Sequence, residues 1–180
     1  MNFEVKGLAT IIKALALAQK ATPARKMRLL VVGRGDERKY REMAVAHGIG
    51  DAVVFAGTRR QDIEKYYRAS DCFAMLSAFD TFGMVVLEAM AASLPVIISS
   101  GVGAKDLVEE GVNGFVVADC RDAERAAGRL GLLLDEKRRS DMGSAAFLTA
   151  SRHDWDALAK RMGDLYMEAL TLKGRVRPGA

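Results

Sequence analysis

The chain has 180 residues, half of them hydrophobic, so it can bury the core of one substantial domain. No apolar run reaches the roughly 18 to 20 residues of a membrane helix, and no signal-peptide block opens the chain. The formal net charge of +4 favours anionic partners, such as phosphates or an acidic membrane surface, and we expect no nucleic-acid partner.

Helical and strand patterns alternate along the sequence. In chain order we predict a helix at 8–19, a strand at 28–33, a helix at 36–48, a strand at 52–57, a short helix at 61–70 and a strand at 72–77. A helix through Glu88 follows, then a strand at 95–100, a helical turn at 106–111 and a strand at 114–118. The remainder is predicted as helices at 121–134, near 140–151, and at 155–172.

Strands of continuous apolar residues, separated by helices, indicate an α/β fold with a Rossmann-like parallel sheet and helices on both faces. We expect one domain over 1–180, with a core at 1–153, a C-terminal helix at 154–172 and a tail at 173–180. The apolar stripe of that helix, which begins at Trp155, is typical of core or interdomain packing. Cys72 and Cys120 have no Cys-x-x-Cys spacing, so free thiols and a cytoplasmic protein are expected.

Ligands of parallel sheets bind beyond the carboxyl ends of the strands, which makes the loops there the candidates. In the first of them, "GRGDER", Gly33 opens a Gly-x-Gly turn. Arg38 stands where a dinucleotide fingerprint has its third glycine, and the P-loop pattern is absent. Two interpretations of Gly33 therefore stay open, a plain tight turn and a phosphate contact.

The loop after the third strand, "SAFDTFGMVVLEAM", places Asp80 just before a predicted helix start, where free backbone N–H groups suit a phosphate or a sugar hydroxyl. Glu88 is the only ionisable side chain between Asp80 and Lys105, and its helical neighbours are apolar. A carboxylate in such surroundings is costly without a hydrogen-bond partner. It is either a structural group, in a buried salt bridge or on a solvent-facing stripe, or an acceptor for the paired hydroxyls of a ribose.

The Asp-x7-Glu arrangement in "DTFGMVVLEAMAASLPVI" resembles the Glu-x7-Glu signature of retaining GT-B glycosyltransferases, known as group 1 or family 4. The segments "NFEVKGL", "LLVVGRGDER", "VVFAGTRRQDIEKYYRASDCF", "GVGAKDLVEEGVNGFVV" and "HDWDALAKRMGDLYMEAL" occur in the family's order. The resemblance covers essentially the whole chain, and its specificity lies in the ordered set. It implies the C-terminal, nucleotide-sugar-binding half of such an enzyme.

The resemblance also implies a catalytic set. Glu88 would accept from the ribose hydroxyls, Asp80 from hydroxyls of the donor sugar, and Lys6 would neutralise the diphosphate. The other donor contacts would come from Gly33, from Thr58 and Arg59 near the nucleobase, and from the backbone amides of Phe82, Gly83, Met84 and Val85. Outside the family frame, Lys6 and Arg59 would be interpreted as ordinary surface charges.

The chain departs from the family pattern in several places. Asp80 is one methylene shorter than the usual glutamate. A strand that ends in an arginine normally precedes the "KG" segment, and here that strand is missing, as is the N-terminal acceptor domain. We expect the missing strand to leave a sheet edge open and the fragment alone to be inactive.

The implied reaction transfers a hexose-like unit from a UDP- or GDP-linked donor to an acceptor hydroxyl with retention, without a cofactor or an obligatory metal. The "NFEVKGL" opening favours lipopolysaccharide or other surface-glycan synthesis, with peripheral contact of the full-length protein at the inner membrane. Two alternatives stay open. One is an enzyme like a nucleotide-sugar epimerase, and the other is a nucleotide-binding module without catalysis.

Overall fold

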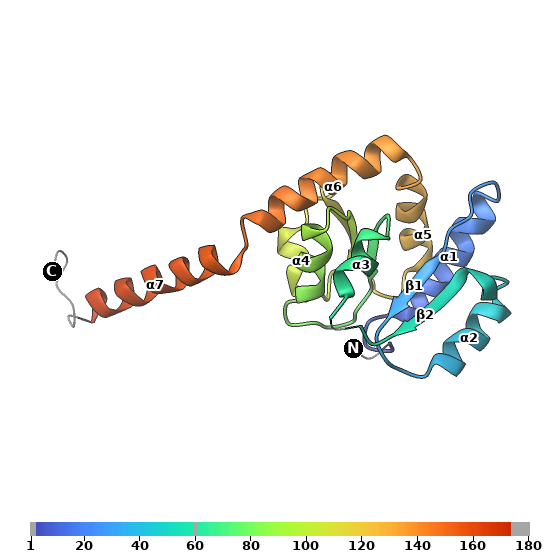
Figure 1. Cartoon of the computed structure of the whole chain (residues 1–180), viewed down its shortest axis with the longest axis horizontal. Helices are drawn as coiled ribbons and strands as arrows, with labels where there is room; N and C mark the ends of the chain where they lie inside the picture. Colours follow the sequence, from blue (N-terminus) through green and yellow to red (C-terminus); the bar gives the residue numbers. More distant parts are fainter. Residues whose placement is uncertain (1–2, 60, 174–180) are drawn as a thin grey trace.

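The computed structural model describes residues 3–59 and 61–173, which form an α/β body from which one long helix extends (Figure 1). The helices are α1 (Leu8–Ala21), α2 (Glu37–Ala46), α3 (Ile63–Arg68), α4 (Met84–Ala91), α5 (Ala123–Leu132), α6 (Glu136–Ser151) and α7 (Trp155–Leu172), with 3-10 turns η1 (Gly50–Ala52) and η2 (Gly103–Leu107). The strands are β1 (Leu29–Val32), β2 (Val53–Gly57), β3 (Phe73–Met75), β4 (Val96–Ser99) and β5 (Gly114–Val117). Every predicted strand is therefore confirmed, with shorter bounds.

The strands are all parallel, as predicted, but the expected single sheet is two hydrogen-bonded sheets in the described chain. β1 pairs with β2, and β4 pairs with β3 on one side and β5 on the other. All four residues of β4 are buried, which explains the uninterrupted apolar run at this point of the sequence. β1 and β3 are not hydrogen-bonded to each other. The sequence pattern therefore predicted where the strands lie but not which strands pair.

Helix α1 joins the two sheets because its apolar residues pack in two directions. Ile11 and Ala14 lie in one core cluster with Ile97 of the three-stranded sheet. Ile12 lies in another cluster with Val31 of the two-stranded sheet. On the opposite face of β4, α4 and α6 enclose a third cluster, so the three-stranded sheet has helices on both faces, as predicted (Figure 1).

Two predicted helical segments are corrected. The turn predicted at 106–111 is the 3-10 turn η2, which begins earlier and ends at Leu107, where the side-chain amide of Asn113 donates to the Leu107 carbonyl at 3.0 Å. The piece predicted near 140–151 is the 16-residue helix α6, which begins at Glu136. Asp135 caps this helix by accepting from the Arg138 N–H at 2.7 Å. The prediction began the helix too late because its first turn is polar and shows no apolar spacing.

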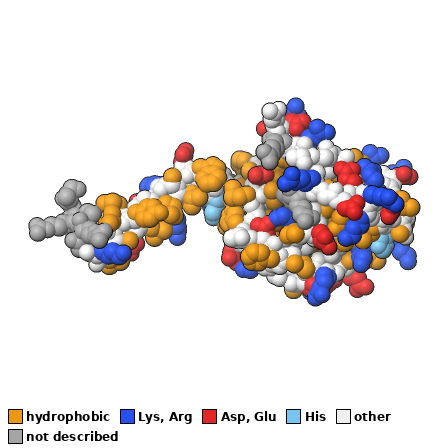
Figure 2. All heavy atoms as spheres, turned by 90° about the horizontal axis from the view of Figure 1, so that it is seen from below, with side chains coloured by type: hydrophobic (Ala, Val, Ile, Leu, Met, Phe, Trp, Pro, Cys, Tyr) orange, Lys and Arg blue, Asp and Glu red, His pale blue; other side chains and the backbone are white. Residues whose placement is uncertain are grey.

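Helix α7 matches its prediction in extent, but the stripe does not pack into the core of the described chain. Its apolar stripe faces solvent: Trp155 is 72% exposed and Tyr166 64% exposed. Figure 2 shows hydrophobic side chains along the extended arm. The tail predicted at 173–180 lies almost entirely outside the described residues. Within the described part of the chain, no helix combines the length and apolarity that crossing a membrane requires.

Candidate functional site

The loops that follow β3 and β4 are hydrogen-bonded to each other at the carboxyl ends of these strands. The Asp80 N–H donates to the Gly101 carbonyl at 2.9 Å, and the Gly103 N–H donates to the Asp80 carbonyl at 2.9 Å. A Cβ on Gly103 would lie 2.1 Å from the Thr81 oxygen, so the close approach requires glycine. Gly101 and Gly103 thus bring two backbone segments together and hold Asp80 in place.

The N-terminal segment is seated against the end of β3. Gly7 has a φ of 72°, and a Cβ at this position would lie 2.0 Å from the Leu76 oxygen. The buried Ser77 hydroxyl donates to the Val5 carbonyl at 2.6 Å. These contacts on both sides of Lys6 fix the backbone from which its side chain extends.

Lys6 and Asp80, both predicted as site residues, form an ion pair between Nζ and Oδ2. The two side chains are 22% and 17% exposed, so Lys6 is not the ordinary surface lysine of the alternative interpretation. Burial lowers the pKa of Lys6, while the adjacent carboxylate favours its ammonium form. In this structure, therefore, the lysine that was expected to bind the diphosphate is paired with Asp80. The sequence did not predict this ion pair.

Helix α4 begins beside this pair with an open N-terminus. Gly83 precedes the helix in the left-handed region, at a φ of 87°, and no side chain caps it. The first N–H groups of the helix, at Met84 and Val85, have no carbonyl to bond within the helix. Phe82 and Met84 are 39% and 45% exposed, so their side chains border a solvent-facing helix start. This geometry can receive an anion or a hydroxyl oxygen.

Glu88 lies on the exposed face of α4, whereas Val86, Ala89 and Met90 form the buried face. This exposure agrees with the solvent-facing stripe that the sequence left open: Met84 and Ala91 are also exposed, and Val85 and Ala92 are only half-buried. No salt bridge to Glu88 exists within the described residues, which removes the buried ion pair as an explanation. Its recorded partner is the Tyr67 hydroxyl, which donates to Glu88 Oε2 at 2.9 Å.

Tyr67 is the residue at this site that the sequence analysis missed. It lies on α3, and its ring packs against Phe73 with centroids 6.2 Å apart. Burial, and next the negative charge of Glu88, raise the pKa of the Tyr67 hydroxyl, so the hydroxyl stays protonated and can donate a hydrogen bond. The available signal was the pair of tyrosines in "EKYYR", whose hydroxyls can donate hydrogen bonds.

Thr58 and Arg59, predicted to lie near the nucleobase, are exposed after β2. The Arg59 guanidinium lies 5.7 Å from the centroid of the Tyr66 ring, which places it beside α3. Gly33 is buried at the end of β1, and its N–H donates to the Gly57 carbonyl at 2.9 Å. That contact continues the pairing of β1 with β2, and the φ of 142° at Gly33 favours glycine, so both interpretations of this residue stay open.

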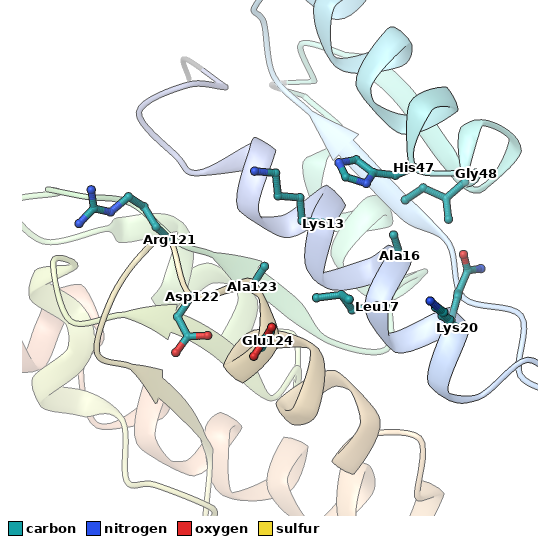
Figure 3. A pocket seen from close by; sticks show the side chains of 12 residues that line it. Lys13, Ala16, Leu17, Lys20, His47, Gly48, Arg121, Asp122, Ala123 and Glu124 are labelled. Atoms are coloured by element: carbon teal, nitrogen blue, oxygen red, sulfur yellow. The ribbon is translucent and has the colours of Figure 1, made fainter.

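A separate hollow of about 920 Å³ lies between α1, the end of α2 and the start of α5 (Figure 3). Lys13 and Lys20 of α1, His47, and Asp122 are among its lining residues, whereas none of the predicted site residues lines it. The Asp122 carboxylate already caps α5 by accepting from the Arg125 N–H at 2.8 Å. Among residues 3–59 and 61–173, no group of three His, Cys, Asp or Glu side chains could hold a metal ion.

Comparisons with known proteins identify a family of similar sequences. The family described as "Glycosyl transferases group 1" matches residues 2–149. A D-inositol 3-phosphate glycosyltransferase of Corynebacterium kroppenstedtii is 31% identical over 98% of this chain and 41% of its own length. A GDP-mannose-dependent alpha-mannosyltransferase of Corynebacterium glutamicum is 30% identical over 83% of this chain and 35% of its own.

Solved structures of glycosyltransferases share the fold. WaaG, a glycosyltransferase involved in lipopolysaccharide biosynthesis, has a TM-score of 0.78 and 26% identity, over 91% of this chain and 44% of that one. Anabaena Alr3699/HepE in complex with UDP has a TM-score of 0.78 and 27% identity, over 92% and 46%. The chain thus spans about two-fifths of the length of the curated relatives it matches.

Proposed function

This chain belongs to the group 1 glycosyl transferases, and we propose that it forms the C-terminal, donor-binding half of a retaining GT-B enzyme of family 4. The proposed reaction moves a sugar from a nucleotide sugar to an acceptor hydroxyl. The bond from the anomeric carbon to the diphosphate oxygen breaks, and a bond to the acceptor oxygen forms with the same anomeric configuration.

The juxtaposition of Lys6 with the uncapped start of α4 is the observation that carries this proposal. Charge builds up on the diphosphate as it leaves, and an ammonium group together with backbone N–H groups stabilises such charge most when they are already in place. Glu88, less than two turns into α4, would accept from the ribose hydroxyls. Arg59, beside α3, would contact the base.

The bound partner is proposed to be a nucleoside diphosphate sugar with uracil or guanine as its base. Uracil is favoured by the HepE complex with UDP, and guanine by the mannosyltransferase that depends on GDP-mannose. The likeness to WaaG supports a place in lipopolysaccharide or other surface-glycan synthesis. We further propose that the protein is cytoplasmic and contacts the membrane peripherally. The net charge of +4 supports the membrane contact, because it favours an anionic surface.

Titration calorimetry of the 180-residue chain with UDP, GDP and ADP tests the proposal. We expect one of them to bind in the high micromolar to millimolar range, about 4 to 6 kcal/mol, because only one side of the cleft is present. Binding should persist in EDTA, since Lys6 and the helix start can carry the diphosphate charge. Lys6→Ala should weaken binding, whereas Lys13→Ala on the exposed face of α1 should not. Absence of binding to all three nucleotides would overturn the proposal.

A further inference from the structure

We propose that Tyr67 is a positioning residue that orients Glu88 for ribose recognition, an inference that rests on the proposed function. Tyr67 on α3 and Glu88 on α4 are joined by the 2.9 Å hydrogen bond from the tyrosine hydroxyl to Oε2. The second carboxylate oxygen, Oε1, has no hydrogen bond within the described part of the chain. One oxygen of Glu88 is therefore anchored to the protein, and the other is free to accept from a ligand.

The anchor is rigid because the Tyr67 ring is held by the core. Tyr67 packs against the buried cluster formed by β3, β4, α4 and α6, and its ring contacts Phe73. Its hydroxyl also lies 3.5 Å from the Val85 carbonyl in the first turn of α4. An exposed glutamate otherwise samples many rotamers, and ordering it on binding costs free energy. A fixed hydroxyl removes part of that cost before the nucleotide arrives.

The neutral charge of the Tyr67 hydroxyl also bears on how Glu88 can bind a ligand. Tyrosine is a neutral donor, so it brings no positive charge beside Glu88 and leaves the second carboxylate oxygen able to accept further hydrogen bonds. Asp80 shows the contrast, because its carboxylate is paired with the ammonium of Lys6. A structural partner for an exposed helix glutamate would ordinarily be a lysine or arginine one turn away. The bond to a neutral, half-buried hydroxyl suits a carboxylate that is kept available for ligand hydroxyls.

This arrangement predicts that Tyr67 controls discrimination between ribose and deoxyribose. The affinities of the whole chain for UDP and 2′-deoxy-UDP are compared in wild type, Tyr67→Phe, Glu88→Gln and the double variant. Tyr67→Phe keeps the packed ring and removes only the hydroxyl. We expect it to reduce the preference for UDP over 2′-deoxy-UDP about threefold to tenfold. It should have no further effect in the Glu88→Gln background, because Tyr67 acts through that carboxylate.

Tyr66→Phe is the matched control, since Tyr66 is the neighbouring tyrosine of α3 and makes no hydrogen bond to Glu88. It should leave the UDP preference unchanged. A Tyr67→Phe variant that binds both nucleotides with an unaltered ratio would overturn the inference. An equal loss of affinity for both nucleotides would also overturn it, because that result indicates a purely structural role.

If Tyr67→Phe does not fold, Tyr67→Met, which keeps an apolar side chain at this position, provides the comparison. Failure of the wild type to bind any nucleotide would instead count against the proposed function.

Discussion

Asp80 shows how a single side chain can set the state of a binding site. It is shorter than the glutamate of the family signature, and in this structure its carboxylate pairs with Lys6. A diphosphate that approaches Lys6 must compete with this internal anion. The pair thus neutralises the lysine while the site is free, and the nucleotide has to displace or share the carboxylate.

We therefore expect Asp80→Asn to strengthen the binding of UDP, because the change removes the competing negative charge and leaves the amide able to fill the same space. For a half-buried ion pair the gain should be about 1 kcal/mol, or roughly fivefold in affinity. Calorimetry with UDP measures it. Asp106→Asn, which removes a surface partner of Lys105, is the control and should have no effect. Weaker UDP binding by Asp80→Asn would show that Asp80 contacts the nucleotide itself.

Glu88→Gln should weaken UDP binding by about 1 to 3 kcal/mol, because a charged acceptor of ribose hydroxyls is replaced by a neutral amide. The fold should be almost unaffected, since Glu88 is exposed and has no ion pair within the described residues. Glu42→Gln, an exposed helix glutamate paired with Arg38, serves as the control. Unchanged affinity together with a lower unfolding midpoint would support a structural role for Glu88 instead.

At the scale of elements, the sequence predicted what depends on neighbouring residues and missed what depends on distant ones. Apolar runs identified every strand, and helical spacing identified α1 and α2 nearly to their ends. The division into two sheets depends on which strands pair, which no local pattern encodes. Likewise Glu88 was correctly placed on α4, but its exposure depends on what covers that face, and its bond to Tyr67 joins two helices.

The junction of the two loops beyond β3 and β4 allows an element-scale prediction. Gly103→Ala should destabilise the protein by about 1 to 3 kcal/mol, because its Cβ would press on the backbone of Thr81 and Phe82, and it should also weaken UDP binding by displacing the start of α4. Gly128→Ala is the matched control: it lies in α5 with nothing near its Cβ, and alanine favours helix by about 0.5 to 1 kcal/mol. Thermal unfolding distinguishes them, and equal effects of the two changes would contradict the proposed junction.

At the scale of the whole molecule, two surfaces remain without partners in the described chain. The edge strands β1, β2, β3 and β5 each have one unpaired side, and such strand sides invite association with further polypeptide. The apolar stripe of α7 is exposed along its length. Interdomain packing stays a prediction for α7, and none of the proposed donor-site residues lies on α7 or in these strands.

We expect the 180-residue chain on its own to transfer no sugar. Retaining transfer needs the acceptor oxygen held close to the anomeric carbon in a water-poor cleft, and such positioning supplies several kcal/mol of the rate enhancement. The proposed site residues, from Lys6 to Glu88, are all assigned to the donor, and the start of α4 is open to solvent. Incubation with radiolabelled UDP- and GDP-sugars and a broad acceptor mixture should give only background hydrolysis.

A protein extended ahead of Met1 by an acceptor domain should transfer sugar, and the Lys6→Ala change should abolish that activity. Turnover by the 180-residue chain at a comparable rate would show that it carries an acceptor site of its own.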